Sequence, residues 1–299
     1  MRRVMGLGGV KTMQIELEKI ACFGVAGNFT GHLEQAGEDK DFTKVKTAEA
    51  NAPKAVFPTY LPRGSSSVQT PDFLHVYPFD EYSIIFPEGE DKLQIEPECA
   101  IVFDVDWQGD QVLSLTPLVF SASNDCSIRK QGATKISQKK NWGPSSKGFA
   151  ANHIKIDHFG PGGILDRYRI ASFLVRGDQV FPYGEDSAIK DYSYFYDKLN
   201  AWLINRFNEQ KDEGPAENIN AYLNESERPT RFMVSVGATR YTDFGKTNFL
   251  KVGDYALVVL YPGDVYSPSE IIHRAVRDNL EEDDVSVLRQ EIIVKGEVV

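Results

Sequence analysis

Hydrophobic and polar positions alternate most clearly between residues 95 and 107. Successive side chains of a β-strand point to opposite faces, so this alternation predicts a strand with one apolar face and one face that carries Glu96 and Glu98. The two glutamates would lie about 7 Å apart at their Cα atoms for a rise of ~3.3 Å per residue, so they can converge on one cation. We expect the apolar face to be core, and it consists of Ile95, Cys99, Ile101, Phe103, Val105 and Trp107.

A second β-rich run follows at residues 112–123, and the turn residues 108–110 predict that the two runs form a hairpin. Asp125 comes directly after this run, so we expect it at a strand end or in the following loop, where it can supply a third carboxylate. Oxygen donors favour Mg²⁺, Mn²⁺ or Ca²⁺ over zinc or copper, which prefer nitrogen and sulfur. The alternative interpretation is that Glu96 and Glu98 lie on a solvated outer face.

The rest of the pattern predicts a mainly β protein of the α+β class. Helices are expected at residues 191–206, where an aromatic stripe indicates core or a subunit contact, and from a capping box at 267–270 to residue 280. We expect a solvated loop for the basic run 130–142, which contains Lys135, Lys139 and Lys140. The other expected strands are residues 14–20, 73–86, 231–236, 255–261 and 285–294.

Composition and charge narrow the class of protein. The 299 residues are 41% hydrophobic and 25% charged, which is typical of a soluble globular protein. A net charge of −10 argues against a nucleic-acid partner, because such proteins present a basic face to phosphates. No apolar run reaches the ~18 residues of a membrane span. Cys22, Cys99 and Cys126 have no paired spacing, so we expect reduced thiols and a cytoplasmic location.

Short motifs between residues 20 and 265 resemble, in order, those of the fumarylacetoacetate hydrolase superfamily. Residues 95–102 resemble its Glu-x-Glu strand, and residues 124–129 its Asn-Asp-x-Ser/Thr-x-Arg motif. The resemblance implies a mixed β-sandwich or β-roll with a few peripheral helices. Residues 1–60 would form an N-terminal segment and lid, and residues 61–299 the metal-binding domain. The further similar segments are 27–32, 146–149, 159–161, 236–239 and 249–254.

The resemblance also implies a site and an activity. A divalent ion, Mg²⁺ or else Mn²⁺ or Ca²⁺, would be the cofactor of a homodimeric hydrolase. The enzyme would break a carbon–carbon bond in a small anionic β-diketo or 2-oxo acid of the acylpyruvate kind, through a metal-bound enolate. Decarboxylation or isomerisation of an oxo acid is open to the same site. The implied metal ligands are Glu96, Glu98 and Asp125, the catalytic residues His32, Glu34 and Lys147, and the substrate contacts Arg129, Gln131 and Thr239.

Two departures from the family leave another function open. Many members have a catalytic Glu three residues after the His, whereas Glu34 follows His32 by two. Residues i and i+2 do not face each other on a helix, so the pair would need a non-helical lid or another acid, such as Glu38. The Lys that usually follows the Phe of the segment at 55–60 is missing. A non-catalytic protein that binds the metal or a ligand is therefore an alternative.

Overall fold

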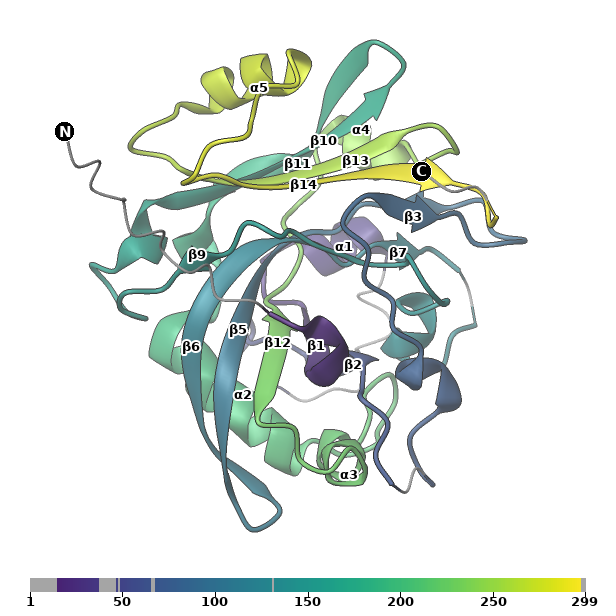
Figure 1. The fold of residues 1–299 in the computed structure, drawn as a ribbon, viewed down its shortest axis with the longest axis vertical. Coiled ribbons are helices and arrows are strands. Elements are labelled where there is room, and N and C mark those ends of the chain that lie inside the picture. Colours follow the sequence, from purple (N-terminus) through teal and green to yellow (C-terminus); the bar gives the residue numbers. More distant parts are fainter. Residues whose placement is uncertain (1–14, 38–46, 48, 66–67, 131, 297–299) are drawn as a thin grey trace, which may run out of the picture.

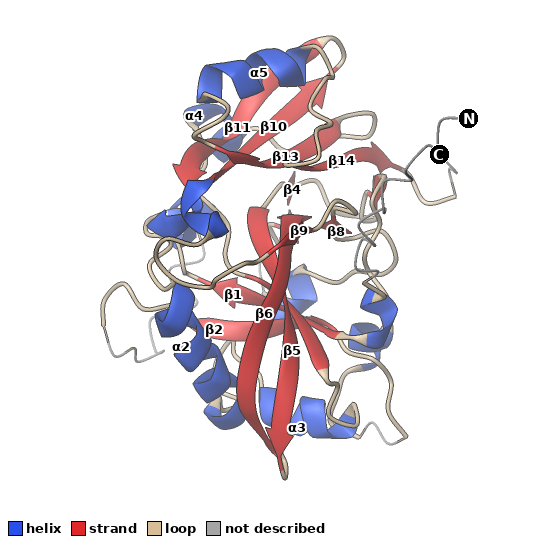
Figure 2. Ribbon diagram, turned by 60° about the vertical axis from the view of Figure 1, so that its left-hand side comes forward, coloured by secondary structure: helices blue, strands red, loops and turns tan. Residues whose placement is uncertain are grey.

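The fold is built mainly from β-strands. The computed structural model describes residues 15–37, 47, 49–65, 68–130 and 132–296, and within these ranges the strands form sheets of seven, five and two strands (Figure 1). The two larger sheets lie one above the other in Figure 2. Their facing sides share one large hydrophobic cluster, which includes Phe103 of the first sheet and Leu260 of the second.

The seven-stranded sheet carries the long hairpin that the alternation predicts. Its strands run in the order β2-β1-β12-β5-β6-β8, with β9 also paired to β6. The β5–β6 hairpin is antiparallel, and β1 pairs in parallel with β12. The bounds are β1 Ala21–Ala26, β2 Ala55–Tyr60, β5 Pro97–Gln108, β6 Gln111–Asn124, β8 Gly148–Phe149, β9 Ile154–Lys155 and β12 Arg231–Ser235.

The five-stranded sheet has the order β11-β10-β13-β14-β3, and the small sheet pairs β4 with β7. The small sheet flanks the start of β5 and the end of β6, because β4 precedes the first and β7 follows the second in sequence. The bounds are β3 Ser83–Ile85, β4 Leu93–Gln94, β7 Ser127–Ile128, β10 Tyr168–Arg176, β11 Gln179–Ala188, β13 Tyr255–Pro262 and β14 Ser286–Ile293.

The helices are short and peripheral. Helix α2 buries Leu199, Leu203 and Phe207 in the main core, so its aromatic stripe is core. Helix α5 packs Ile271 and Ala275 on the outer face of the five-stranded sheet. The α-helices are α1 His32–Ala36, α2 Tyr196–Glu209, α3 Ile219–Glu225, α4 Asp243–Thr247 and α5 Pro268–Val276, and single 3-10 turns lie at Leu17–Lys19, Asp72–His75, Ile136–Lys139, Ile164–Arg167 and Ile189–Asp191.

Most of the expected elements are confirmed, and four are wrong in detail. The helix expected at 191–206 begins at Tyr196 and ends at Glu209. Residue 14 of the expected strand 14–20 lies outside the described residues, and the rest contains a 3-10 turn at Leu17–Lys19, followed by β1 from Ala21. Residues 73–86 contribute a 3-10 turn and only the three-residue strand β3. Helix α5 starts at the predicted capping box but ends at Val276, four residues before the expected residue 280.

The strand of Glu96 and Glu98 also differs from the expectation. Strand β5 begins at Pro97, so Glu96 precedes it. Its second face is not solvated beside the glutamates, because Ala100 and Val102 lie in another buried cluster with Cys22 and Met233. The interpretation of Glu96 and Glu98 as a solvated face is therefore wrong.

Strands β1 and β2, from the expected N-terminal segment 1–60, pair in the same sheet as β5 and β6 of the expected metal-binding domain. The division at residue 60 stays a prediction. Over the described part of the chain, no helix is both long and apolar enough to cross a membrane.

Candidate metal centre

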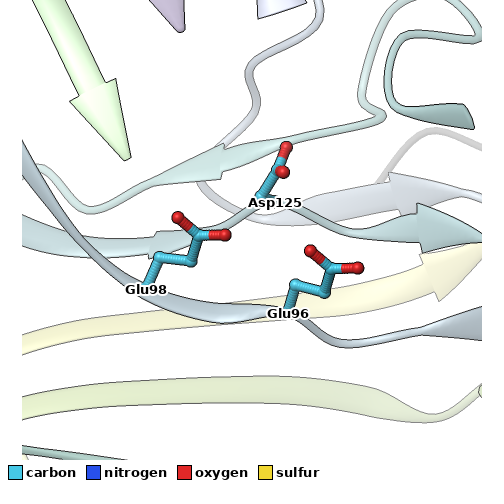
Figure 3. A group of neighbouring side chains, drawn as sticks. All are labelled: Glu96, Glu98 and Asp125. Atoms are coloured by element: carbon cyan, nitrogen blue, oxygen red, sulfur yellow. The ribbon is translucent and has the colours of Figure 1, made fainter. Parts of the chain in front are cut away.

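The hairpin register brings Glu96, Glu98 and Asp125 together. Pro97 on β5 is paired with Asn124 on β6, so the residues on either side of that pair are neighbours. The backbone N–H of Asp125 donates to the carbonyl of Glu96 at 3.0 Å, and the backbone N–H of Glu96 donates to Asn124 Oδ1 at 3.2 Å. Figure 3 shows the three carboxyl groups gathered on the same side of the hairpin.

The three carboxyl groups form a buried cluster of oxygen donors. One ligand atom from each lies within 4.8 Å of the others, and the residues are only 4%, 1% and 2% exposed. Within the described residues, Glu96 Oε1 and both side-chain oxygens of Asp125 accept no hydrogen bond of normal geometry. Buried carboxylate oxygens are normally satisfied, so these atoms have capacity for another ligand.

Three cationic side chains surround the carboxylates. Arg129 Nη2 lies 2.7 Å from Glu96 Oε1, and Lys147 Nζ lies 3.2 Å from Asp125 Oδ1. Lys140 Nζ contacts both acids, at 2.5 Å from Glu96 Oε2 and 2.7 Å from Asp125 Oδ2. These distances are short, but the directions to Glu96 Oε1 and to Asp125 are poor for hydrogen bonds. These contacts to Glu96 Oε1 and Asp125 are therefore ion pairs without hydrogen-bond geometry.

The expectation of a solvated basic loop is wrong for two of its lysines. Lys140 and Lys139 are 2% and 6% exposed, and Lys140 is part of the site. Lys135 lies nearer the surface, where it pairs with Asp212 at 2.8 Å. The signal that could have identified Lys140 is charge balance, because a buried acidic cluster needs cations nearby and this run lies between Arg129 and Lys147.

The pKa values of Glu96 and Glu98 are shifted in opposite directions. Burial alone would raise the pKa of Glu96, but Lys140 and Arg129 outweigh burial, so the pKa is lowered. Burial raises the pKa of Glu98 well above its usual range, and the negative charges of Asp125 and Glu96 add to this. The hydrogen bond at 2.8 Å from the Gly237 N–H opposes the shift only in part. The cationic side chains therefore compensate the negative charge near Glu98 less than that at Glu96.

Arg129 is held in place by two residues that the sequence did not single out. Its Nε donates to Gln94 Oε1 at 2.6 Å, and its Nη2 donates to the Tyr241 hydroxyl at 2.8 Å. The Tyr241 hydroxyl in turn donates to the carbonyl of Ile95 at 3.0 Å. No sequence pattern connects Tyr241 with Arg129, because the two are brought together only by the sheets.

His32 lies beside the carboxylates at the start of α1. Its ring Nδ1 is 2.8 Å from the carbonyl oxygen of Thr239, and a carbonyl can only accept, so Nδ1 donates. The N–H of Thr239 is bound to the carbonyl of Pro97 at 3.3 Å, which ties this contact to β5. Glu34 points to solvent from the helix. Gln131 and Glu38 lie outside the described residues.

The cavity at the site is small. Its volume is about 20 Å³, which suffices for an ion or one water molecule but not for an oxo acid. It lies between the carboxylates and a cover formed by Leu33, Phe57 and Ile136. A larger hollow of about 670 Å³ elsewhere contains none of the residues of the site, so size alone does not mark the functional position.

Comparison with known proteins places the chain in a family. Residues 38–292 match the model of DUF5718, which is described as a family of unknown function. The chain belongs to the DUF5718 family. No curated protein matches this DUF5718 sequence.

Solved structures resemble this DUF5718 fold. The structure of Cg1458 with an inhibitor is 15% identical, with a TM-score of 0.53 over 92% of this chain and 77% of that chain. The structure of 2-keto-3-deoxy-D-arabinonate dehydratase complexed with magnesium and 2,5-dioxopentanoate is also 15% identical, with a TM-score of 0.53 over 99% and 84%. The fold is that of these solved structures, so the mainly β architecture with mixed sheets and a few helices that the sequence motifs imply is confirmed.

The residues of the cluster fit a divalent ion. Hard oxygen donors are the ligands that Mg²⁺, Mn²⁺ and Ca²⁺ prefer, and oxygens of Glu96 and Asp125 lack normal hydrogen bonds. Glu98 is the acid for which nearby negative charge is least compensated. A divalent ion among the three acids would supply that charge.

Proposed function

We propose that this DUF5718 protein is an enzyme that holds Mg²⁺, or else Mn²⁺ or Ca²⁺, on Glu96, Glu98 and Asp125 and acts on a small anionic β-diketo or 2-oxo acid. The observation that supports this most strongly is the convergence of three buried carboxylates within 4.8 Å. With a divalent ion, the cluster and its three cationic neighbours would carry a net positive charge. Such a site favours an anion.

When bound, the ion would act as a Lewis acid on a substrate carbonyl. Arg129 and Lys147 are the residues that would neutralise the negative charge that develops on the substrate. Arg129 is well oriented for this, because Gln94 and Tyr241 fix its guanidinium. Lys147 is nearly fully buried, and burial lowers its pKa although Asp125 opposes the shift.

His32 is the proposed general base. With Nδ1 donating to Thr239, the neutral ring carries its lone pair on Nε2, the atom that would take a proton from water. The backbone carbonyl of Thr239 would orient the His32 ring, so this role would not require Glu34. The altered spacing of His32 and Glu34 is therefore compatible with catalysis.

Hydrolysis of a carbon–carbon bond is the reaction that we propose. Water deprotonated by His32 would add to the ketone carbon, the bond between that carbon and the neighbouring carbon would break, and the released carbon would take up a proton. Arg129, Lys147 and Thr239 would bind the acid, and Gln131 stays among the proposed substrate contacts. Decarboxylation and isomerisation of an oxo acid stay open as alternatives at the same site.

A non-catalytic metal-binding role is the second candidate. It is favoured by the cavity volume of about 20 Å³, which accommodates an ion but admits a substrate only if the cover over the site moves. Turnover distinguishes the two candidates. Acylpyruvates and oxaloacetate offered with Mg²⁺ or Mn²⁺ should be consumed if the protein is an enzyme, and none should be consumed if it only binds.

The test of the metal site is direct. Elemental analysis of the purified protein and calorimetric titration with Mn²⁺ should show one divalent ion per chain. Glu98→Gln should weaken Mn²⁺ binding by about 100-fold or more, because it removes a buried negative charge next to the ion. Asp106→Asn is the matched control, since Asp106 is exposed on the same strand. Equal affinities of the two variants would refute the site.

We propose a homodimer in the cytoplasm, and light scattering of the purified protein tests the first part. The three cysteines are free and buried, which fits a reducing compartment.

A further inference from the structure

The Lys140 ammonium holds the oxygens that an ion at the carboxylates would need. It lies 2.5 Å from Glu96 Oε2 and 2.7 Å from Asp125 Oδ2, and its side chain is only 3% exposed. It also donates to the carbonyl of Asp125 at 3.4 Å. One ammonium group thus contacts two of the three proposed ligand residues. An ion can bind both oxygens only if the ammonium moves away.

The backbone next to Lys140 is firmly anchored, so the side chain is the part that can move. The side-chain amide of Asn141 donates to the carbonyls of Thr59 and Val76, both at 2.9 Å, and of Phe73 at 3.2 Å. Lys140 Nζ also lies 5.3 Å from the centre of the Phe57 ring. An aromatic face attracts an ammonium group, so Phe57 keeps the cation inside the cavity when its contacts with the acids are lost.

We propose that Lys140 is a displaceable cation that competes with the divalent ion for Glu96 and Asp125 and then binds the carboxylate of the anionic substrate. This inference rests on the proposed function. The competition follows from charge. A doubly charged ion is attracted more strongly to the carboxylate oxygens than an ammonium group is, and the two cations repel each other too strongly to contact the same oxygens together. The displaced ammonium remains in the cavity, close to the ion, where an anion offsets their mutual repulsion.

Ion affinity tests the first half of the proposal. Mn²⁺ should bind to Lys140→Met and Lys140→Gln about tenfold tighter or more than to the wild type, because the internal competitor is gone. Damage to the fold would weaken binding, so the expected change has the opposite sign to a structural defect. Lys140→Gln keeps a donor for the acids in case Lys140→Met does not fold. Lys135→Met is the matched control, because Lys135 lies in the same segment and pairs with Asp212.

Anion affinity tests the second half. Oxalate, which presents two carboxylates as a 2-oxo acid presents a carboxylate and a ketone, is titrated into the Mn²⁺-loaded proteins. It should bind to the Lys140 variants about tenfold more weakly than to the wild type and to Lys135→Met. The proposal thus predicts tighter ion binding and weaker anion binding from the same substitution.

The outcomes separate this inference from the proposed function. If the wild type binds Mn²⁺ and the Lys140 variants bind it no more tightly, Lys140 is not a competitor and the inference is overturned while the metal site stands. If the wild type binds no Mn²⁺ but the variants do, the ion cannot displace Lys140 and the inference is overturned, while the three acids remain able to bind an ion. If neither the wild type nor any variant binds Mn²⁺, the metal site and the inference both fail.

Discussion

Glu217 should make the protein less stable as the pH rises through neutrality. This carboxyl is 1% exposed, and its Oε1 accepts a hydrogen bond from the Ser137 hydroxyl at 2.6 Å. Its Oε2 has no hydrogen-bond partner among the described residues. Burial raises its pKa from the ordinary 4.5 to about 7, opposed by the Ser137 hydrogen bond and by Lys135. The folded protein therefore holds this proton more tightly than the unfolded chain does.

The size and sign of the effect follow from these two pKa values. Stability that depends on protonated Glu217 is fully present below pH 4.5 and is lost as the pH rises to about 7. The gap between the two values, at about 1.36 kcal/mol per pKa unit, corresponds to roughly 3 kcal/mol of unfolding free energy. Glu217→Gln keeps an acceptor for Ser137 and removes the ionisation, so its stability should lack this pH dependence.

Urea unfolding of both proteins at about pH 5 and about pH 8.5 measures the difference. The free energy of unfolding of Glu217→Gln relative to the wild type should increase by roughly 2–3 kcal/mol between the two pH values. The unpaired atom at the Oε2 position remains in both proteins at both pH values, so its cost largely cancels. Glu213→Gln removes the same charge at an exposed position of the same loop and controls for net charge. A relative stability that does not change with pH would refute the reasoning.

Three further substitutions test the general base, the backbone contact to Glu98 and the hydrophobic core. His32→Ala should lower turnover by about 10²–10⁴-fold, the usual contribution of a general base, with Mn²⁺ affinity unchanged by calorimetry; a parallel loss of affinity would mean that His32 supports the metal site instead. Gly237→Ala should lower the melting temperature and weaken Mn²⁺ binding, because Gly237 has φ +120° and a Cβ there would lie 3.1 Å from the Cβ of Asn28, disturbing the N–H that binds Glu98. A variant as stable as the wild type with unchanged affinity would contradict this. Phe103→Ala should lower the free energy of unfolding by about 3–5 kcal/mol, since Phe103 is fully buried in the main hydrophobic cluster; a loss below about 1 kcal/mol in urea unfolding would show that this core is not closely packed.

The sequence predicts best those features that depend on residues close to one another along the chain. Alternation over β5 and β6 and the turn between them determine the hairpin, and the hairpin alone places Asp125 beside Glu96. The capping box of α5 is likewise a local feature. Metal-ligand candidates on one hairpin are therefore predictable from the chain. Their burial was not, because the second face of β5 is covered by residues such as Cys22 and Met233 from distant strands.

Contacts between distant segments account for what the sequence did not reveal. The residue pattern of one segment does not indicate which distant carbonyl a histidine in it will contact. The Thr239 carbonyl that accepts from His32 Nδ1 is 207 residues away along the chain. Lys140 belongs to a run whose charge suggested solvent, yet its long side chain reaches inward to the acids. The parallel pairing of β1 with β12 joins residues near 22 to residues near 233, which no periodicity indicates.

The central claim is that Glu96, Glu98 and Asp125 bind one divalent ion. Crystals grown with Mn²⁺ and measured near the manganese absorption edge test it most directly. We expect a single strong anomalous peak among the three carboxylates, with Lys140 Nζ displaced from Glu96 and Asp125. Well-ordered carboxylates without such a peak, still paired with Lys140 in the presence of excess Mn²⁺, would contradict it.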